Sequence, residues 1–153
     1  MMHTRGAILL VEDNDDDVIL IRRALQKGGV TAPVTVVRDG QQAVDYLAGN
    51  GLYTDTALFP LPFVMLLDLK LPRKSGLEVL EWVRSHATLG TLPIVVFTTS
   101  TLETDLRAAY GLGANSYLKK PGTVAETTEL LRAVGSYWLQ HNQQPPALHR
   151  GTA

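Results

Sequence analysis

The stretch Phe63-Val-Met-Leu-Leu-Asp68 decides the fold. Five consecutive apolar residues without polar alternation are typical of a strand that is buried on both faces of a parallel sheet. The acidic residue that follows would lie at the carboxyl end of that strand. In open α/β sheets, functional sites form where the carboxyl ends of the strands meet. The stretch therefore predicts a parallel sheet with a carboxylate at its functional edge.

Three other apolar runs are also followed closely by polar residues: 7–11 by Glu12 and Asp13, 94–97 by Thr98, and 116–118 by Lys120. A fifth strand is predicted over residues 34–37, because this run is rich in β-branched side chains. The carboxyl ends of parallel strands share one edge of a sheet. We therefore expect the acids, the hydroxyl and the lysine to surround a single site.

Segments with helical spacing of apolar residues separate the strands, at 15–27, 41–48, 77–86, 104–112 and 124–140. Strands that alternate with helices predict the α/β class, with a doubly wound parallel sheet and helices on both of its faces. We expect one domain over residues 7–141, an N-terminal tail at 1–6 and a flexible C-terminal tail at 142–153. The loop at 49–62 holds several glycines and prolines, so regular structure is not expected there.

The composition excludes several classes of function. The chain has 153 residues, 45% of them hydrophobic and 19% charged, as in ordinary globular proteins. A net charge of −1 gives no electrostatic basis for binding nucleic acid or acidic membranes. The absence of cysteine excludes disulfides, thiol catalysis and cysteine-bound zinc, and no apolar run approaches the roughly 18 residues of a membrane span. We expect a cytoplasmic protein that binds neither nucleic acid nor membrane.

The three acids of the predicted site call for a cation. Glu12, Asp13 and Asp68 cannot all be ionised and close together without one, because like charges repel. Mg²⁺ prefers oxygen ligands, and Mn²⁺ accepts the same set. We expect Asp13 and Asp68 to bind the metal directly, Glu12 directly or through water, and the main-chain carbonyl of Lys70 to complete the protein ligands.

Asp68 beside such a metal is suited to accept a phosphoryl group. A carboxylate can act as a nucleophile and form an acyl phosphate. The Lys120 ammonium and the Thr98 hydroxyl could each contact a phosphoryl oxygen. Thr98 would be drawn inward only after phosphorylation, which is the differential contact that a two-state switch requires. The run 15–17 is predicted only to favour the N-terminus of the first helix through its dipole.

These motifs together resemble the response-regulator receiver domain of two-component signalling. The resemblance rests on Ile8-Leu-Leu-Val-Glu-Asp13, Leu66-Leu-Asp-Leu-Lys-Leu-Pro72 with Gly76, Pro93-Ile-Val-Val-Phe-Thr98 and Ser116-Tyr-Leu-Lys-Lys-Pro121. It implies a flavodoxin-like sheet with strand order 2-1-3-4-5 and a sensor histidine kinase as the phosphoryl donor. The chain would then catalyse only its own phosphorylation and dephosphorylation.

The resemblance also implies a role for each matching residue. Asp68 is similar to the phosphoacceptor, Glu12 and Asp13 to the acidic Mg²⁺ pair, Lys120 to the phosphoryl-binding lysine, and Thr98 and Tyr117 to the switch residues. For Tyr117, plain packing is an equally good explanation of a residue type that favours strands. The family often has a cis bond after this lysine, so Lys120–Pro121 is a candidate for that isomer.

A narrower resemblance is to the phytochrome-associated single-domain regulators. It rests on Val11-Glu-Asp-Asn14 with Asp17, on Asn50-Gly-Leu-Tyr53 and on Gly135-Ser-Tyr-Trp-Leu139. It implies a bacterial phytochrome as the kinase, and a homodimer. The residues after 140 are too few for a DNA-binding helix-turn-helix, so we expect output by protein contact or by onward transfer to a phosphotransfer protein.

Alternative functions remain open from the sequence. A pseudo-receiver would bind partners without phosphorylation, although every residue that it could lose is present. A Mg²⁺-dependent phosphohydrolase of the haloacid-dehalogenase type would need Asp-x-Asp, whereas Asp68 is followed by Leu69 and Lys70. In a flavodoxin-like electron carrier, Glu12 and Asp13 would repel the flavin phosphate.

Overall fold

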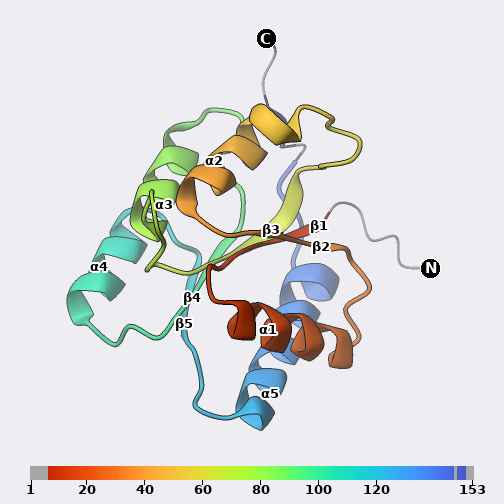
Figure 1. Cartoon of the computed structure of the whole chain (residues 1–153), viewed down its shortest axis with the longest axis vertical. Coiled ribbons are helices and arrows are strands. Elements are labelled where there is room, and N and C mark those ends of the chain that lie inside the picture. Colours follow the sequence, from red (N-terminus) through yellow and green to blue (C-terminus); the bar gives the residue numbers. More distant parts are fainter. Residues whose placement is uncertain (1–6, 147, 151–153) are drawn as a thin grey trace.

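The structure is a computed structural model that describes residues 7–146 and 148–150. Its five strands form one parallel sheet in the order β2-β1-β3-β4-β5, the flavodoxin-like order that the resemblance to receiver domains implies (Figure 1). The strands are β1 at Ala7–Val11, β2 at Val34–Val37, β3 at Pro62–Leu67, β4 at Ile94–Thr98 and β5 at Ser116–Lys119. Residues 1–6, predicted as an N-terminal tail, lie outside the described residues.

Five α-helices cover both faces of the sheet (Figure 1). They are α1 at Asp15–Lys27, α2 at Gly40–Ala48, α3 at Gly76–Ser85, α4 at Glu103–Gly111 and α5 at Val124–Gly135. Buried residues of α1 and α5 pack on one face of the sheet, and buried residues of α2, α3 and α4 pack on the other. The doubly wound architecture predicted from the alternating pattern is therefore confirmed.

The central strands β1 and β3 have uninterrupted apolar sequences because helices cover both faces of the sheet. In β1, Leu9 points into the core on the side of α2, α3 and α4, while Ile8 and Leu10 point into the core on the side of α1 and α5. Met65 and Leu66 of β3 divide between the two cores in the same way. Successive side chains of a strand face opposite sides, so a strand covered on both sides has no position for a solvated polar residue.

Local hydrogen bonds fix where the helices begin next to the functional edge of the sheet. The Asn14 side chain accepts a hydrogen bond from the Asp17 main-chain N and caps α1. Ser75 and Glu78 form a reciprocal capping box at the start of α3. Such caps satisfy main-chain N–H groups that have no partner within the helix.

Two segments differ from the structure that the sequence predicts. The loop after α2 contains a 3₁₀ helix, η1 at Gly51–Tyr53. Phe59 packs edge-on against both Tyr53 and Tyr46, and the rings of Tyr46 and Tyr53 are tilted against each other, so an aromatic cluster holds this loop. The last predicted helix does not continue as one α-helix to residue 140. It changes at Ser136 into a π-helical segment, η2 at Ser136–His141.

The C-terminal segment contacts the domain through residues 148–150, and the His149 main-chain N donates to Thr88 O at 3.4 Å. Arg150 donates hydrogen bonds to the main-chain oxygens of Tyr46 and Phe59, at 3.1 and 2.6 Å. Leu148 packs against the core below α2 and α3. The flexibility of residues 142–153 stays a prediction, although Leu148 and Arg150 pack against the domain. Within the part of the chain that the structure describes, none of the helices combines the length and apolar character needed to cross a membrane.

Gly76 tests how tightly α3 is joined to the end of β3. A Cβ at this position would lie 2.2 Å from the main-chain oxygen of Asp68 and 2.7 Å from the Cα of Leu69. We expect Gly76→Ala to lower the free energy of unfolding by about 1–3 kcal/mol, measured by urea denaturation, because the backbone on both sides must move. At Gly122 a Cβ would meet no atom within 4 Å, so Gly122→Ala is expected to change stability by less than about 0.5 kcal/mol. Equal effects of the two substitutions would contradict this packing.

Candidate functional site

The Lys120 ammonium lies among three carboxylates that come from different parts of the chain. Its Nζ is 2.5 Å from Glu12 Oε1, 2.9 Å from Asp17 Oδ2 and 3.1 Å from Asp68 Oδ2. Glu12 follows β1, Asp17 lies in the first turn of α1, Asp68 follows β3 and Lys120 follows β5. The ends of β1, β3 and β5 thus contribute to one site, as expected from the strand-end pattern.

Main-chain hydrogen bonds hold these side chains at the edge of the sheet. The main-chain N of Glu12 donates to Val37 O at 3.0 Å, and that of Asp68 donates to Val11 O at 3.1 Å. The main-chain N of Lys120 donates to Thr98 O at 2.7 Å. Each bond extends the ladder of the sheet one residue beyond a regular strand. The positions of the charged groups therefore follow from the register of the strands.

Three carboxylates form a cluster that could hold a divalent cation. One oxygen each of Glu12, Asp13 and Asp68 lies within 4.8 Å of the others. Glu12 and Asp68 are only 1% and 8% exposed, whereas Asp13 is exposed. Hard oxygen ligands that face partly into solvent suit Mg²⁺ or Mn²⁺, which retain bound waters. The main-chain N of Lys70 donates to Asp68 Oδ1 at 3.3 Å, and the Lys70 carbonyl as a ligand stays a prediction.

Burial and pairing shift the pKa values of the two groups at the centre of the site. Burial raises the pKa of Glu12 above its usual range, although the hydrogen bond and charge of Lys120 oppose the rise. Burial alone would lower the pKa of Lys120. Its hydrogen bonds to Glu12 and Asp17 and the charge of Asp68 outweigh this effect and raise the pKa. Lys120 therefore remains a cation at neutral pH.

Thr98 and Tyr117, the predicted switch residues, both contact Ser100. Thr98 is fully buried at the end of β4, and its Oγ1 accepts a long hydrogen bond of 3.4 Å from the Ser100 main-chain N. The Tyr117 hydroxyl donates to Ser100 O at 3.2 Å. In the described part of the chain, no hydrogen bond joins either side chain to Asp68. Their switching role stays a prediction.

A second polar network beside the site was not anticipated from the sequence. Asp105 Oδ2, in the first turn of α4, accepts a hydrogen bond of 2.5 Å from Ser100 Oγ and lies 3.4 Å from Lys70 Nζ. The hydrogen bond from Ser100 lowers the pKa of Asp105. Lys70 and Ser100, two residues after Asp68 and Thr98, are thereby connected through α4.

The contact of Asp17 with Lys120 was also missed, because the run 15–17 was assigned only to the helix dipole. A signal for it exists in the sequence. Asp17 lies four residues before Ile21, whose side chain is buried against the sheet, so the two share a face of α1. Asp15 instead pairs with Arg38, as a surface residue of the first turn can.

One implication of the family resemblance is wrong. The described residues contain no cis peptide bond, so Lys120–Pro121 is trans. Bonds that precede proline favour the trans form by about 0.5–1 kcal/mol unless the structure imposes the other. Here the trans form already places the Lys120 ammonium against its three carboxylates.

Comparison with known proteins identifies the class of this protein. The family described as the response regulator receiver domain matches residues 8–132, and the chain belongs to this family. Receiver-domain response regulators are generally signalling proteins rather than enzymes that turn over a substrate. This agrees with the predicted class and with the observed strand order.

Two individual relatives are similar to this protein over most of its length. The probable methanogenesis regulatory protein FilR2 of Methanothrix harundinacea is 41% identical over 141 residues, which cover 90% of this chain and 86% of the relative. The response regulator Rcp1 of Synechocystis is 36% identical over 140 residues, which cover 92% of this chain and 93% of the relative. The chain is therefore related to two regulators of similar length.

Solved structures agree with these relationships. The phosphorylated cyanobacterial phytochrome response regulator RcpA has a TM-score of 0.86 and 37% identity, covering 92% of this chain and 99% of that one. The Mn²⁺-bound form of Rcp1 has a TM-score of 0.84 and 35% identity, with coverage of 92% and 99%. The chain is thus related to phytochrome response regulators.

Lys120→Met tests whether the ammonium stabilises the buried carboxylates. Without the cation, Glu12 and Asp68 would be left close together and unpaired. We expect the free energy of unfolding without metal to fall by about 3 kcal/mol in urea denaturation, and added Mg²⁺ to restore more stability than it adds to the wild type. The neighbouring Lys119 is exposed, so Lys119→Met is expected to leave stability nearly unchanged. An equal loss in both variants would argue against the pairing.

Proposed function

We propose that this protein is a response regulator that accepts a phosphoryl group on Asp68 from a sensor histidine kinase. The observation that carries the proposal is the pairing of Lys120 Nζ with Asp68 Oδ2 at 3.1 Å, inside a cluster with Glu12 and Asp13. This arrangement supplies a buried nucleophile, a cation for the incoming group and ligands for a metal. Membership of the receiver family supports the same chemistry.

The reaction requires no reagent beyond the phosphorylated kinase. One oxygen of the Asp68 carboxylate attacks the phosphorus of a phosphohistidine, and the new O–P bond forms as the P–N bond breaks. The electron pair of the P–N bond stays on the imidazole nitrogen, which takes up a proton from solvent. The product is an acyl phosphate at Asp68. Later attack by water releases inorganic phosphate and restores the carboxylate.

We assign the metal to Glu12, Asp13, Asp68 and the main-chain carbonyl of Lys70, with Mg²⁺ or Mn²⁺ as the ion. Bound there, the ion would neutralise the negative charge that builds up around the transferred group. The carboxylate cluster supports this assignment, as does the Mn²⁺ in the structure of the relative Rcp1. Thr98 and Lys120 would orient the remaining phosphoryl oxygens.

The switch follows from contacts that phosphorylation would rearrange. Among the described residues, the one hydrogen bond of the Thr98 hydroxyl is the long one that it accepts from the Ser100 main-chain N at 3.4 Å, so a phosphoryl oxygen would be a stronger partner for it. Movement of Thr98 would disturb Ser100, whose carbonyl accepts from Tyr117 and whose hydroxyl donates to Asp105 of α4. Through these contacts, phosphorylation at Asp68 would change the conformation of the surface around α4.

We also propose a kinase, an oligomeric state and an output partner for this regulator. The relationship to RcpA supports a bacterial phytochrome as the kinase, whereas the name of FilR2 refers to methanogenesis and not to light. A homodimer is supported by an exposed apolar stripe along α4, formed by Leu102, Leu106 and Tyr110. Output would pass to a protein partner or to a phosphotransfer protein in the cytoplasm, without contact to nucleic acid or membrane.

Phosphorylation at Asp68 is tested with small phosphoryl donors. With Mg²⁺ present, we expect acetyl phosphate to add one phosphoryl group per chain in intact-protein mass spectrometry, and beryllofluoride to bind stoichiometrically. Asp68→Asn should abolish both, because the amide is not a nucleophile. Asp55→Asn, a change in the loop before β3, should abolish neither. Retention of both signals in the Asp68 variant would refute the assignment, and their absence in the wild type would favour a pseudo-receiver. Sustained release of phosphate over many cycles would favour a phosphohydrolase.

The identity of the kinase is tested by transfer of labelled phosphate from a panel of purified histidine kinases. If the light-signalling proposal is correct, a bacterial phytochrome should transfer its phosphate within seconds to minutes, at a rate that depends on red or far-red illumination. Kinases from unrelated systems should be much slower. Rapid transfer from a kinase of another class alone would refute the phytochrome assignment and leave the receiver function intact.

A further inference from the structure

Asp17 is the partner of Lys120 that lies outside the carboxylate cluster. An ammonium has three N–H donors. Here they are directed at Glu12, Asp17 and Asp68. Glu12 and Asp68 belong to the cluster that could hold a metal, and Asp17 does not. Its main chain is fixed by the cap at Asn14, so α1 presents the Asp17 carboxylate to the lysine.

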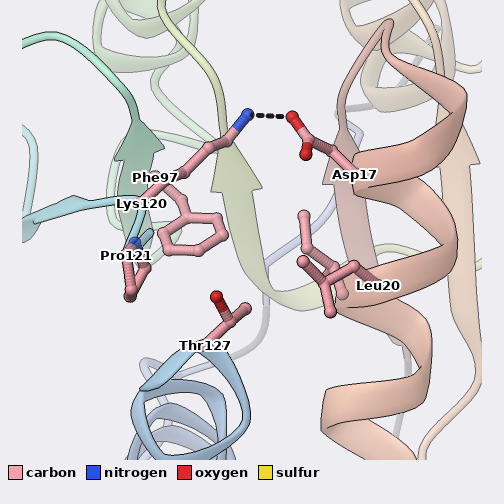
Figure 2. A pocket seen from close by; sticks show the side chains of 7 residues that line it. Asp17, Leu20, Phe97, Lys120, Pro121 and Thr127 are labelled. Carbon is pink, nitrogen blue, oxygen red and sulfur yellow. Dashed lines mark hydrogen bonds and ion pairs between the residues drawn. The ribbon is translucent and has the colours of Figure 1, made fainter. Parts of the chain in front are cut away.

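Among the described residues that line the cavity between Lys120 and α5, Asp17 provides the one carboxylate that can accept a hydrogen bond from the Lys120 ammonium. Figure 2 shows the Lys120 side chain extending past the Phe97 ring to Asp17. These residues line a cavity of about 30 Å³. The Nζ lies 5.9 Å from the centre of the Phe97 ring. Besides Asp17 and Lys120, the one polar side chain that lines the cavity is Thr127, whose hydroxyl donates to the Thr123 carbonyl. The direction of the ammonium is therefore set by its three carboxylates.

The charges around the site explain why Asp17 matters. The carboxylates of Glu12, Asp13, Asp17 and Asp68 and the ammonium of Lys120 give a formal net charge of −3. A divalent ion reduces this to −1, so the Asp17 charge favours metal binding. A phosphoryl group on Asp68 brings further negative charge and needs a donor from Lys120. Asp17 repels this group and competes for the same ammonium.

We propose that Asp17 is a positioning residue for Lys120, and that it strengthens metal binding while it weakens phosphoryl binding at Asp68. The inference rests on the proposed function of Asp68 and adds a residue that sets how readily the phosphorylated state is reached. Asp17 is suited to this task because its side chain is 35% exposed, so its contact with Lys120 can break without leaving a buried charge unpaired.

The test compares Asp17→Asn with Asp16→Asn. Asp16 lies in the same turn of α1, is exposed, and its carboxylate forms no hydrogen bond or ion pair with the described residues, so its variant controls for the lost charge and the helix dipole. Calorimetric titration gives the affinity for Mg²⁺ alone and the affinity for beryllofluoride at saturating Mg²⁺. For Asp17→Asn we expect Mg²⁺ to bind about three- to tenfold more weakly and beryllofluoride about three- to tenfold more tightly.

The control variant should change neither affinity by more than about twofold. Asp17→Ser, which keeps a small polar side chain, should shift both affinities in the same directions as Asp17→Asn, and urea denaturation checks that all variants are folded. A merely structural role of Asp17 would weaken both affinities together. That result, or equal behaviour of the Asp16 and Asp17 variants, overturns the inference while the proposed function stands. A wild-type protein that binds Mg²⁺ but no beryllofluoride overturns both.

Discussion

The structure depends on one ammonium at the carboxyl edge of the sheet. Glu12 and Asp68 are almost fully buried, and two close carboxylates in such a place remain ionised at little cost only with a cation between them. Lys120 supplies that cation from a position 108 residues after Glu12 and 52 residues after Asp68. The pairing therefore requires β1, β3 and β5 to be correctly assembled, and it couples the stability of the domain to the chemistry of the site. A bound metal ion would add positive charge beside these carboxylates, and a phosphoryl group on Asp68 would add negative charge.

The strands and the charged residues at their ends were predictable because a buried parallel strand has a continuous run of apolar residues in the sequence. One apolar run that ends in an acid or a lysine has ordinary structural explanations, but four such runs in one order place their polar residues at the same edge of a parallel sheet. Asp17 and Asp105 were not predictable in the same way. An acidic residue in the first turn of a helix looks identical whether it interacts with the dipole or reaches across to another element. For Asp17, the spacing of four residues from the buried Ile21 places the carboxylate on the sheet-facing side of α1, but the spacing alone does not identify Lys120 as its partner.

The segments that differ most from expectation are those in which distant side chains impose order. The loop after α2 has the glycines of an irregular loop, yet Tyr53 and Phe59 pack against Tyr46 and fix its course. Arg150 then bonds to the main chain at both ends of this aromatic cluster. Sequence patterns report local periodicity, and contacts between single residues far apart in the chain leave no periodic signal.

Two polar networks meet at Asp68 and lead to different parts of the domain. One joins Asp68 through Lys120 to Asp17 of α1. The other joins Asp68 through the main chain of Lys70 to its side chain and to Asp105 of α4. Ala109 is the one buried residue of α4, whereas α1 has four. Since apolar burial anchors a helix, we expect α4 to yield more readily than α1 if phosphorylation changes the contacts of Asp68.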